Sequence, residues 1–465
     1  MEREICDCPS RAGSVLRELL ITPFRLNIQQ IMKPDFNKAE TGNKIYNMIE
    51  RLYPICRSIT GDGVRETLAL VSEIIPLTVH EVTSGTKVLD WEIPPEWNIR
   101  DAWIKNDKGE KIVDFKVSNL HVLNYSIPVD KKVTLSELKK HLYTLSDHPD
   151  WIPYRTSYYN RTWGFCMEHN KYEKLEEGTY HVKVDATLEP GSLTYGEFFI
   201  QGKTNEEILI STHVCHPSLC NDNLSGITVA AYAAQQLMAM DPYYSYRFLF
   251  IPGTIGSITW LSQNEDRVKN IKHGLVLTLL GDTSAFHYKK SRRENAEIDR
   301  VVTHVLKHRH SKYEVIDFYP YGYDERQFCS PGFNLPVGRL TRKPHGEFPE
   351  YHTSADNLGF VKKDKLVESL DLLFAIFNVI ENDKTYVNLK PKGEPQLGKR
   401  GLYKKTGGQS TSKDYQMALL WVLNLSDGTN TLLDIAERSD LPFGLVLEAT
   451  RALLQTDLLT EKTVI

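Results

Sequence analysis

Four residues in the middle of this chain have the types and spacing of metal ligands. His213 directly follows one short apolar run, and Asp282 follows another after a single glycine. Asp222 begins an Asp-Asn-Leu-Ser-Gly segment shortly after His213, and His352 lies in a later loop. Because functional groups collect at the carboxyl ends of parallel strands in an α/β sheet, we expect these side chains to meet at one edge. Such ligands are typical of hydrolytic zinc sites, so the sequence predicts a metallo-hydrolase.

The Asp222 segment has a second interpretation, because Asp and Asn often cap the start of a helix. Taken alone, the segment favours neither role, but its combination with His213, Asp282 and His352 favours metal binding. One part of the expected site is missing. A third apolar run, between those before His213 and Asp282, ends in Pro252-Gly253-Thr254, where no acid stands.

The elements that must position these residues can be placed from hydrophobic periodicity and turn residues. Strand and helix patterns alternate from about residue 181 to 385, as a mostly parallel sheet flanked by helices requires. Short strand and hairpin patterns precede this region, and a segment rich in Gly, Pro and Lys follows it. The predicted divisions are an unassigned segment 1–40, an α/β domain of 41–78 and 181–385, an inserted β-rich domain of 79–180, a linker of 386–409, and a winged-helix-like domain of 410–465.

Composition limits the classes of protein that this chain can be. Its 465 residues are 41% hydrophobic and 25% charged, with a net charge of −4. These are the proportions of a soluble globular protein, and no run reaches the ~18–20 apolar residues that cross a bilayer. The seven cysteines lack CxxC spacing, and the N-terminus lacks the apolar stretch of a signal peptide. We therefore expect a cytoplasmic protein without a membrane or nucleic-acid partner.

The C-terminal 50 or so residues contain three short helical patterns that resemble a winged helix-turn-helix. Their charge is even or slightly acidic, whereas DNA binding depends on Lys and Arg at phosphates. We therefore expect this module, or the inserted domain, to mediate protein contacts such as homo-oligomer formation.

The motifs, taken in order, are similar to those of the co-catalytic zinc aminopeptidases, whose relatives include glutaminyl cyclases. From about residue 43 to 465 the chain resembles, more closely, a family of bacterial proteins with an aminopeptidase-like domain. Those proteins are often associated with polysaccharide or secondary-metabolite biosynthesis, and they carry an inserted β domain and a C-terminal winged helix. Three segments resemble signatures of that family: Arg57-Ser58-Ile59-Thr60-Gly61, His213-Val214-Cys215-His216-Pro217-Ser218 and Tyr323-Asp324-Glu325-Arg326-Gln327-Phe328.

The resemblance implies a role for each predicted ligand. Asp222 would bridge two zinc ions, His213 and Asp282 would complete one site, and His352 would belong to the other. Tyr351 would polarise the scissile carbonyl. The aminopeptidases also have a Glu-Glu pair, one a general base and one a ligand, where this chain has Pro252-Gly253-Thr254.

The expected activity is zinc-dependent hydrolysis of an amide or peptide bond in a small molecule or peptide. The alternative is a non-catalytic protein, or other acyl or amide chemistry.

The missing glutamates leave the general base to be found elsewhere. Glu325 is the first candidate, because its loop precedes His352, and Glu347 and Glu350 come next. Glu325 has an equal alternative as an acid paired with a neighbouring arginine. The predicted substrate-binding residues are Arg57, His216, Tyr158 and Arg326. The aromatic segment that contains Tyr158 either lines a pocket or packs the inserted domain on the catalytic one.

Overall fold

A large mixed sheet organises the middle of the molecule. The computed structural model describes residues 36–402 and 413–462. The eight strands of the sheet, in spatial order, are β1 (Thr78–Thr83), β10 (Ser192–Ile200), β12 (Ser245–Ile251), β11 (Glu207–His213), β13 (Ile271–Leu277), β16 (Val337–Thr341), β14 (Phe286–Lys289) and β15 (Tyr313–Ile316). The central strands β12, β11, β13 and β16 are parallel to one another. Strands β1 and β10 on one side, and β14 on the other, add antiparallel pairs. The predicted α/β class with a mostly parallel sheet is confirmed.

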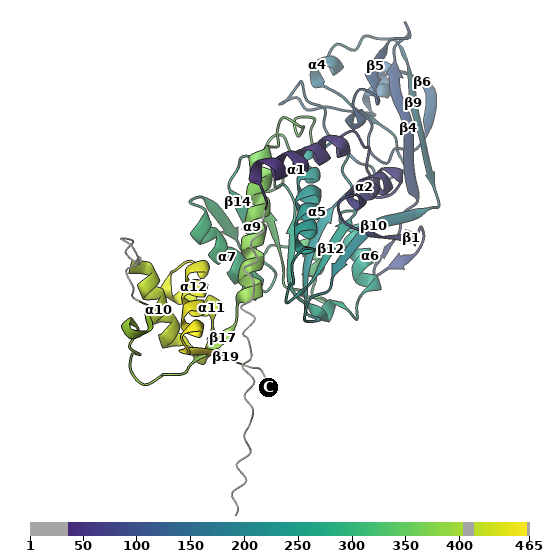
Figure 1. Cartoon of the computed structure of the whole chain (residues 1–465). Helices are drawn as coiled ribbons and strands as arrows, with labels where there is room; N and C mark the ends of the chain where they lie inside the picture. The colour runs from purple at the N-terminus through teal and green to yellow at the C-terminus, as the bar shows by residue number, and fades with distance from the viewer. Residues whose placement is uncertain (1–35, 403–412, 463–465) are drawn as a thin grey trace, which may run out of the picture. The chain divides into compact units, whose positions relative to one another are not determined.

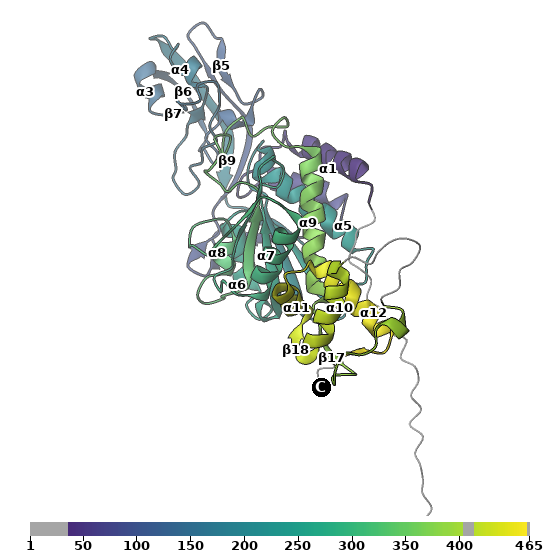
Figure 2. The same ribbon diagram turned by 90° about the vertical axis from the view of Figure 1, so that its left-hand side faces the viewer.

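Both faces of this sheet are covered, which explains why its central strands are continuous apolar runs. In β11, Ile208 and Ile210 pack into one buried cluster, while Leu209 packs into the other. This alternation is the period of two expected when side chains point to opposite faces of a strand. Figures 1 and 2 show α1, α5, α7 and α9 on one face and α6 and α8 on the other. The helices of the domain are α1 (Lys38–Leu52), α2 (Asp62–Ser72), α5 (Gly226–Leu237), α6 (Ile255–Gln263), α7 (Glu297–Arg309), α8 (Glu325–Phe328) and α9 (Lys363–Asn382).

A second, antiparallel sheet lies between β1 and β10 in the sequence. Its strand order is β5-β4-β9-β6, and alternate residues of β9 are buried, as in a sheet with one core-facing side. Because β1 pairs with β10 in the large sheet, the chain leaves that sheet and returns to it around this region. The region contains β2 (Lys87–Val88), β3 (Trp91–Glu92), β4 (Glu96–Lys105), β5 (Lys111–Asp114), β6 (Val129–Thr134), α3 (Leu135–Lys139), β7 (Leu142–Tyr143), β8 (Phe165–Cys166), α4 (His169–Tyr172) and β9 (Thr179–Glu189).

The C-terminal elements form three helices and a small three-stranded sheet of order β18-β17-β19. They are β17 (Thr385–Asn388), α10 (Lys413–Leu425), β18 (Asp427–Thr431), α11 (Leu432–Ser439), α12 (Phe443–Gln455) and β19 (Leu459–Glu461). Strand β17 lies largely within the stretch predicted as a linker, and it is the central strand of this sheet. Within the described ranges, no helix has both the length and the apolarity needed to span a membrane.

Candidate metal centre

Asp222 is the centre of a buried cluster of imidazole side chains. It lies in the turn Cys220–Ser225, immediately before α5, and has no exposed surface. Its Oδ1 atom is 2.8 Å from Nε2 of His213, which is the last residue of β11. Its Oδ2 atom is 3.0 Å from Nε2 of His352, which lies in the later loop. Each carboxylate oxygen of Asp222 thus faces a different histidine.

A third imidazole completes the cluster. His216 Nε2 is 3.9 Å from Asp222 Oδ2, and ligand atoms of His213, His216 and Asp222 all lie within 4.8 Å of one another. Burial lowers the pKa of His216 well below its ordinary value, so its imidazole is neutral at pH 7. Burial alone would raise the pKa of Asp222, but the imidazoles of His216, His213 and His352 hold it well below its usual range. A neutral imidazole and an ionised carboxylate are the donor forms that a metal requires.

Buried hydrogen bonds fix the backbone around Asp222. The carboxylate of Asp356 accepts from the backbone N–H groups of Asn221 at 2.6 Å and Asp222 at 2.9 Å. Burial raises the pKa of Asp356 to about 8. The Asn221 amide donates to Asp282 Oδ2 at 2.8 Å, and its oxygen accepts from Gly281 N–H at 2.8 Å. These contacts tie the Asp222 turn to the segment after β13.

Tyrosine rings surround the imidazoles. Tyr323 stacks on His213 with ring centroids 5.1 Å apart, and Tyr351 stacks on His352 at 3.9 Å. Tyr154 meets His352 edge-on at 5.0 Å, and its hydroxyl is 3.1 Å from that of Tyr158. These ring contacts restrict the orientation of the imidazole planes.

The donor set fits zinc. Three imidazoles and one carboxylate match the nitrogen and oxygen ligands that zinc prefers. The two oxygens of Asp222 face different histidines, which is the arrangement of a carboxylate able to bridge two ions. His213, Asp222 and His352, together with His216, which was predicted to bind substrate, are the residues here that could hold a metal.

Asp282 lies beside this cluster and has other partners. Its Oδ2 atom accepts from Asn221, and its Oδ1 atom accepts from the Ser284 N–H at 2.6 Å. Within the described residues its carboxylate forms no hydrogen bond or ion pair with His213 or Asp222, so its predicted role as a ligand rests on the resemblance.

The two arginines predicted to bind substrate contact other parts of the protein in this structure. Arg57 is fully buried, and its guanidinium donates to the carbonyls of His216 at 2.7 Å and Leu52 at 2.8 Å. It thereby holds the His216 backbone beside the cluster. The guanidinium of Arg326 lies over the ring of Tyr321, 5.8 Å from its centroid. Tyr158 contacts Tyr154 through their hydroxyl groups, as described above.

The predicted base, Glu325, belongs to a buried ion cluster. Its Oε1 atom is 3.0 Å from Lys289 Nζ and 3.8 Å from Arg339 Nη1, and all three side chains are fully buried. The alternative of a cation-paired acid thus describes its surroundings here, with Lys289 as the nearer partner. Glu347 is exposed and Glu350 is half-buried.

Two buried acids at the site were not singled out from the sequence. Asp356 supports the Asp222 turn, and Asp324 contacts the loop Pro252-Gly253-Thr254 through a 2.6 Å hydrogen bond from Thr254 N–H. Asp324 precedes Glu325 in the segment of residues 323–328 that resembles a family signature. The sequence does not indicate which of these two neighbouring acids faces the loop.

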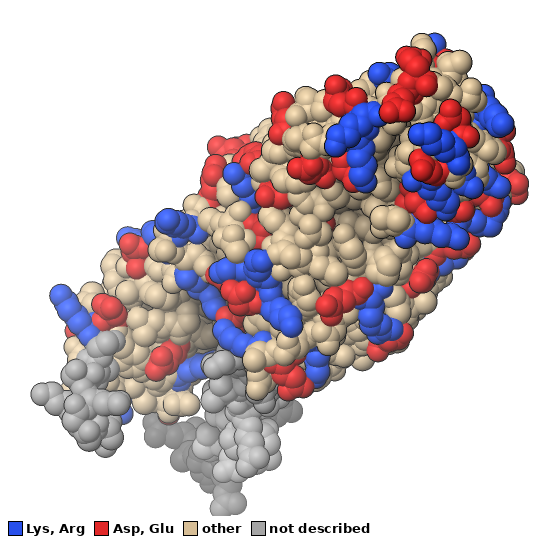
Figure 3. All heavy atoms as spheres, turned by 90° about the horizontal axis from the view of Figure 1, so that it is seen from above, with Lys and Arg blue, Asp and Glu red and all other residues tan. Residues whose placement is uncertain are grey.

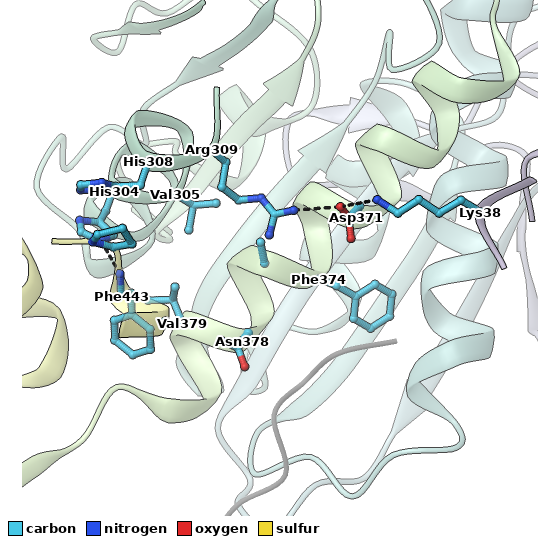
Figure 4. Close-up of a pocket in the computed structure, with 13 residues that line it drawn as sticks. Lys38, His304, Val305, His308, Arg309, Asp371, Phe374, Asn378, Val379 and Phe443 are labelled. Carbon is cyan, nitrogen blue, oxygen red and sulfur yellow. Dashed lines mark hydrogen bonds and ion pairs between the residues drawn. The ribbon is translucent and has the colours of Figure 1, made fainter. Parts of the chain in front are cut away.

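A cavity of about 550 Å³ lies elsewhere, between α7, α9 and the start of α12 (Figure 4). Lys38 and Arg309 both contact Asp371 at its wall, at 3.2 and 2.8 Å. His304 Nε2 accepts from the Phe443 N–H at 3.2 Å. The cavity lining contains none of the predicted site residues, so the metal centre around Asp222 is the better candidate site.

Residues 46–461 of the chain match two known families. Residues 46–383 match the family described as "Domain of unknown function (DUF4910)", and residues 384–461 match a winged helix-turn-helix. A curated protein of Clostridium acetobutylicum, named for polysaccharide biosynthesis and an aminopeptidase-like domain, is 54% identical over 432 residues. That match covers 93% of this chain and 99% of the relative. The chain belongs to this family of aminopeptidase-like proteins with a C-terminal winged helix, as its motifs predicted.

Solved structures of other proteins are similar to this chain in fold. A crystal structure from Clostridium acetobutylicum, named as a peptidase, is 53% identical and has a TM-score of 0.88, covering 92% of this chain and 98% of that one. The zinc aminopeptidase BSAP from Bacillus subtilis has a TM-score of 0.54 at 13% identity, covering 74% and 95%. The second likeness shows that the α/β domain has the aminopeptidase fold.

Proposed function

We propose that this protein is a zinc-dependent hydrolase of amide or peptide bonds in a small molecule or peptide. The observation that carries the proposal is Asp222, whose two oxygens face His213 and His352 at the carboxyl edge of an aminopeptidase-like sheet. The name of the Clostridium relative suggests that the substrate belongs to polysaccharide biosynthesis.

The protein's own side chains have distinct roles in this proposal. Bound zinc supplies a Lewis acid and a water molecule of lowered pKa. Burial raises the pKa of Tyr351, so its hydroxyl stays protonated and can donate a hydrogen bond to a developing oxyanion. The rings of Tyr323 and Tyr154 pack against His213 and His352 and add to the burial of Asp222, and burial strengthens electrostatic interactions.

The alternative is a non-catalytic protein or other acyl chemistry on the same fold. It is favoured by Gly253 and Thr254, because no acid stands in this loop to act as a base. Without a positioned base, the rate of hydrolysis is lower by a factor of typically 10²–10⁴.

Zinc removal separates these functions. We expect the zinc-loaded protein to cleave members of a mixture of peptides and N-acylated amino sugars, as followed by mass spectrometry. The chelated protein should be inactive, and added zinc should restore cleavage. Cleavage that is equal with and without zinc would contradict the proposal. A zinc-loaded protein that binds a member of the mixture and leaves it intact would support the non-catalytic alternative.

We further propose that the C-terminal module binds protein, including a second copy of this chain, and not DNA. Acids outnumber bases within residues 413–462: Asp414, Asp427, Asp434, Glu437, Asp440, Glu448, Asp457 and Glu461 against Lys413, Arg438, Arg451 and Lys462. Helix α12 is the second helix of the helix-turn-helix, and Arg451 is its one basic residue. Figure 3 shows one face of the whole chain, on which acidic and basic side chains are interspersed.

This charge balance predicts no measurable binding of random duplex DNA at physiological salt. A fluorescence anisotropy titration checks this expectation. Micromolar affinity that falls steeply with salt would contradict it. Deletion of residues 384–465, which removes β17 together with its partners β18 and β19, should change the oligomeric state, as measured by light scattering.

A further inference from the structure

The loop after β12 is the place from which an acid would reach His213. Strands β11 and β12 are parallel neighbours, and Ile251 is the register partner of His213. A Cβ atom built on Gly253 would lie 3.7 Å from His213 Cβ and 3.3 Å from Cys215 Sγ. The loop thus directly borders the metal centre, yet Pro252-Gly253-Thr254 offers it no carboxylate.

Asp324 brings a carboxylate to this loop from a distant part of the chain. Its Oδ1 atom accepts from Thr254 N–H at 2.6 Å and from the Ser257 hydroxyl at 3.0 Å. The residue is only 2% exposed. Its Oδ2 atom is buried and has no hydrogen-bond partner among the described residues. One oxygen therefore anchors the side chain on the loop, and the other remains available.

The His213 ring likewise has a buried nitrogen that lacks a hydrogen-bond partner among the described residues. Its Nε2 atom faces Asp222, while its buried Nδ1 atom has no hydrogen-bond partner within the described ranges. Tyr323, the neighbour of Asp324, stacks on the His213 ring at 5.1 Å. Burial raises the pKa of Asp324, and the nearby His213 imidazole is the strongest influence in the opposite direction. Both atoms are buried, and neither has another hydrogen-bond partner among the described residues that would compete for it.

We propose that Asp324 is a positioning residue of the metal centre, which acts through His213 from the loop where residues 253–254 offer no carboxylate. This inference rests on the zinc site of the proposed function. Histidine ligands of metals almost always direct their second nitrogen to a carboxylate, carbonyl or water, which fixes the ring and raises its basicity. Asp324 is the acid placed to do this for His213. The favourable interaction strengthens when bound metal makes the imidazole more positive.

Zinc titration of the metal-free protein tests this role without any substrate. Asp324→Asn keeps an oxygen that can accept from Thr254 and Ser257, but it removes the charge. We expect its zinc affinity to fall by about 10- to 100-fold, with the melting temperature of the metal-free protein unchanged. Asp324→Glu should recover part of the affinity. Asp299→Asn is the matched control, because Asp299 is a buried acid at the start of α7.

The outcomes separate this inference from the proposed function. Equal zinc affinity in Asp324→Asn and wild type would overturn the role of Asp324 while leaving the zinc site intact. A wild-type protein that binds no zinc would overturn the proposed function itself. Ser257→Ala removes one hydrogen bond to Asp324 and retains its charge. An equal loss of affinity in Ser257→Ala would assign the effect to loosening of the α6 start and contradict the inference.

Discussion

Asparagine at position 222 should lower the zinc affinity of this protein by more than about 100-fold, which exceeds the loss typical of residues outside the ligand set. The substitution preserves size but removes the carboxylate whose two oxygens contact His213 and His352. The imidazoles would then have no negative charge between them to balance a divalent ion. Competition titration with a chromophoric chelator measures the affinity.

Two further substitutions help to interpret this result, one as a control and one as a test of another predicted ligand. Asp371→Asn changes an acid of α9 that pairs with Lys38 and Arg309, so zinc binding should be unchanged. Asp282→Asn tests the ligand role that the resemblance implies. A loss comparable to that of Asp222→Asn would assign Asp282 to the metal, while a small loss would leave it as a partner of Asn221. Wild-type affinity in Asp222→Asn would refute the assignment of the centre.

Glu325→Gln should destabilise the fold by roughly 3–5 kcal/mol, because it leaves buried cations without their carboxylate. Lys289 and Arg339 are both fully buried, and Glu325 Oε1 is 3.0 Å from the lysine. Burial already lowers the pKa of Lys289, which shows the cost of its charge in this environment. Urea unfolding followed by circular dichroism measures the change.

The double substitution Glu325→Gln with Lys289→Met provides the control. Removing one cation together with the acid should recover part of the lost free energy of unfolding. Because of this ion cluster, turnover by Glu325→Gln must be read from folded protein only. A variant that keeps wild-type stability yet loses turnover would reverse the interpretation and favour Glu325 as the general base.

The large sheet could be predicted from the sequence because its central strands are apolar on both faces. The runs before His213 and Gly281 are continuous, since their residues pack into clusters on opposite sides. The meeting of His213, Asp222 and His352 follows from the same logic, because parallel strands end at one edge. Strand β17 was harder to predict. Its partners, β18 and β19, lie far along the chain, so its local sequence resembles a linker.

Side-chain partners account for what the sequence could not show. Asp282 is separated from its partner Asn221 by 61 positions, and Glu325 is separated from Lys289 by 36. Asp324 and Glu325 are adjacent acids of one short segment, yet one faces the Gly253 loop and the other faces Lys289. No local pattern distinguishes them, because the direction of each carboxylate depends on strands that arrive from elsewhere.

Anomalous X-ray scattering measured just above and just below the zinc absorption edge tests the central claim most directly. Crystals of the zinc-loaded protein should show a peak that disappears below the edge, within bonding distance of Asp222, His213 and His352. A second peak at the other oxygen of Asp222 would identify a two-ion centre. The absence of any peak at Asp222, or zinc bound only at surface residues, would contradict the account.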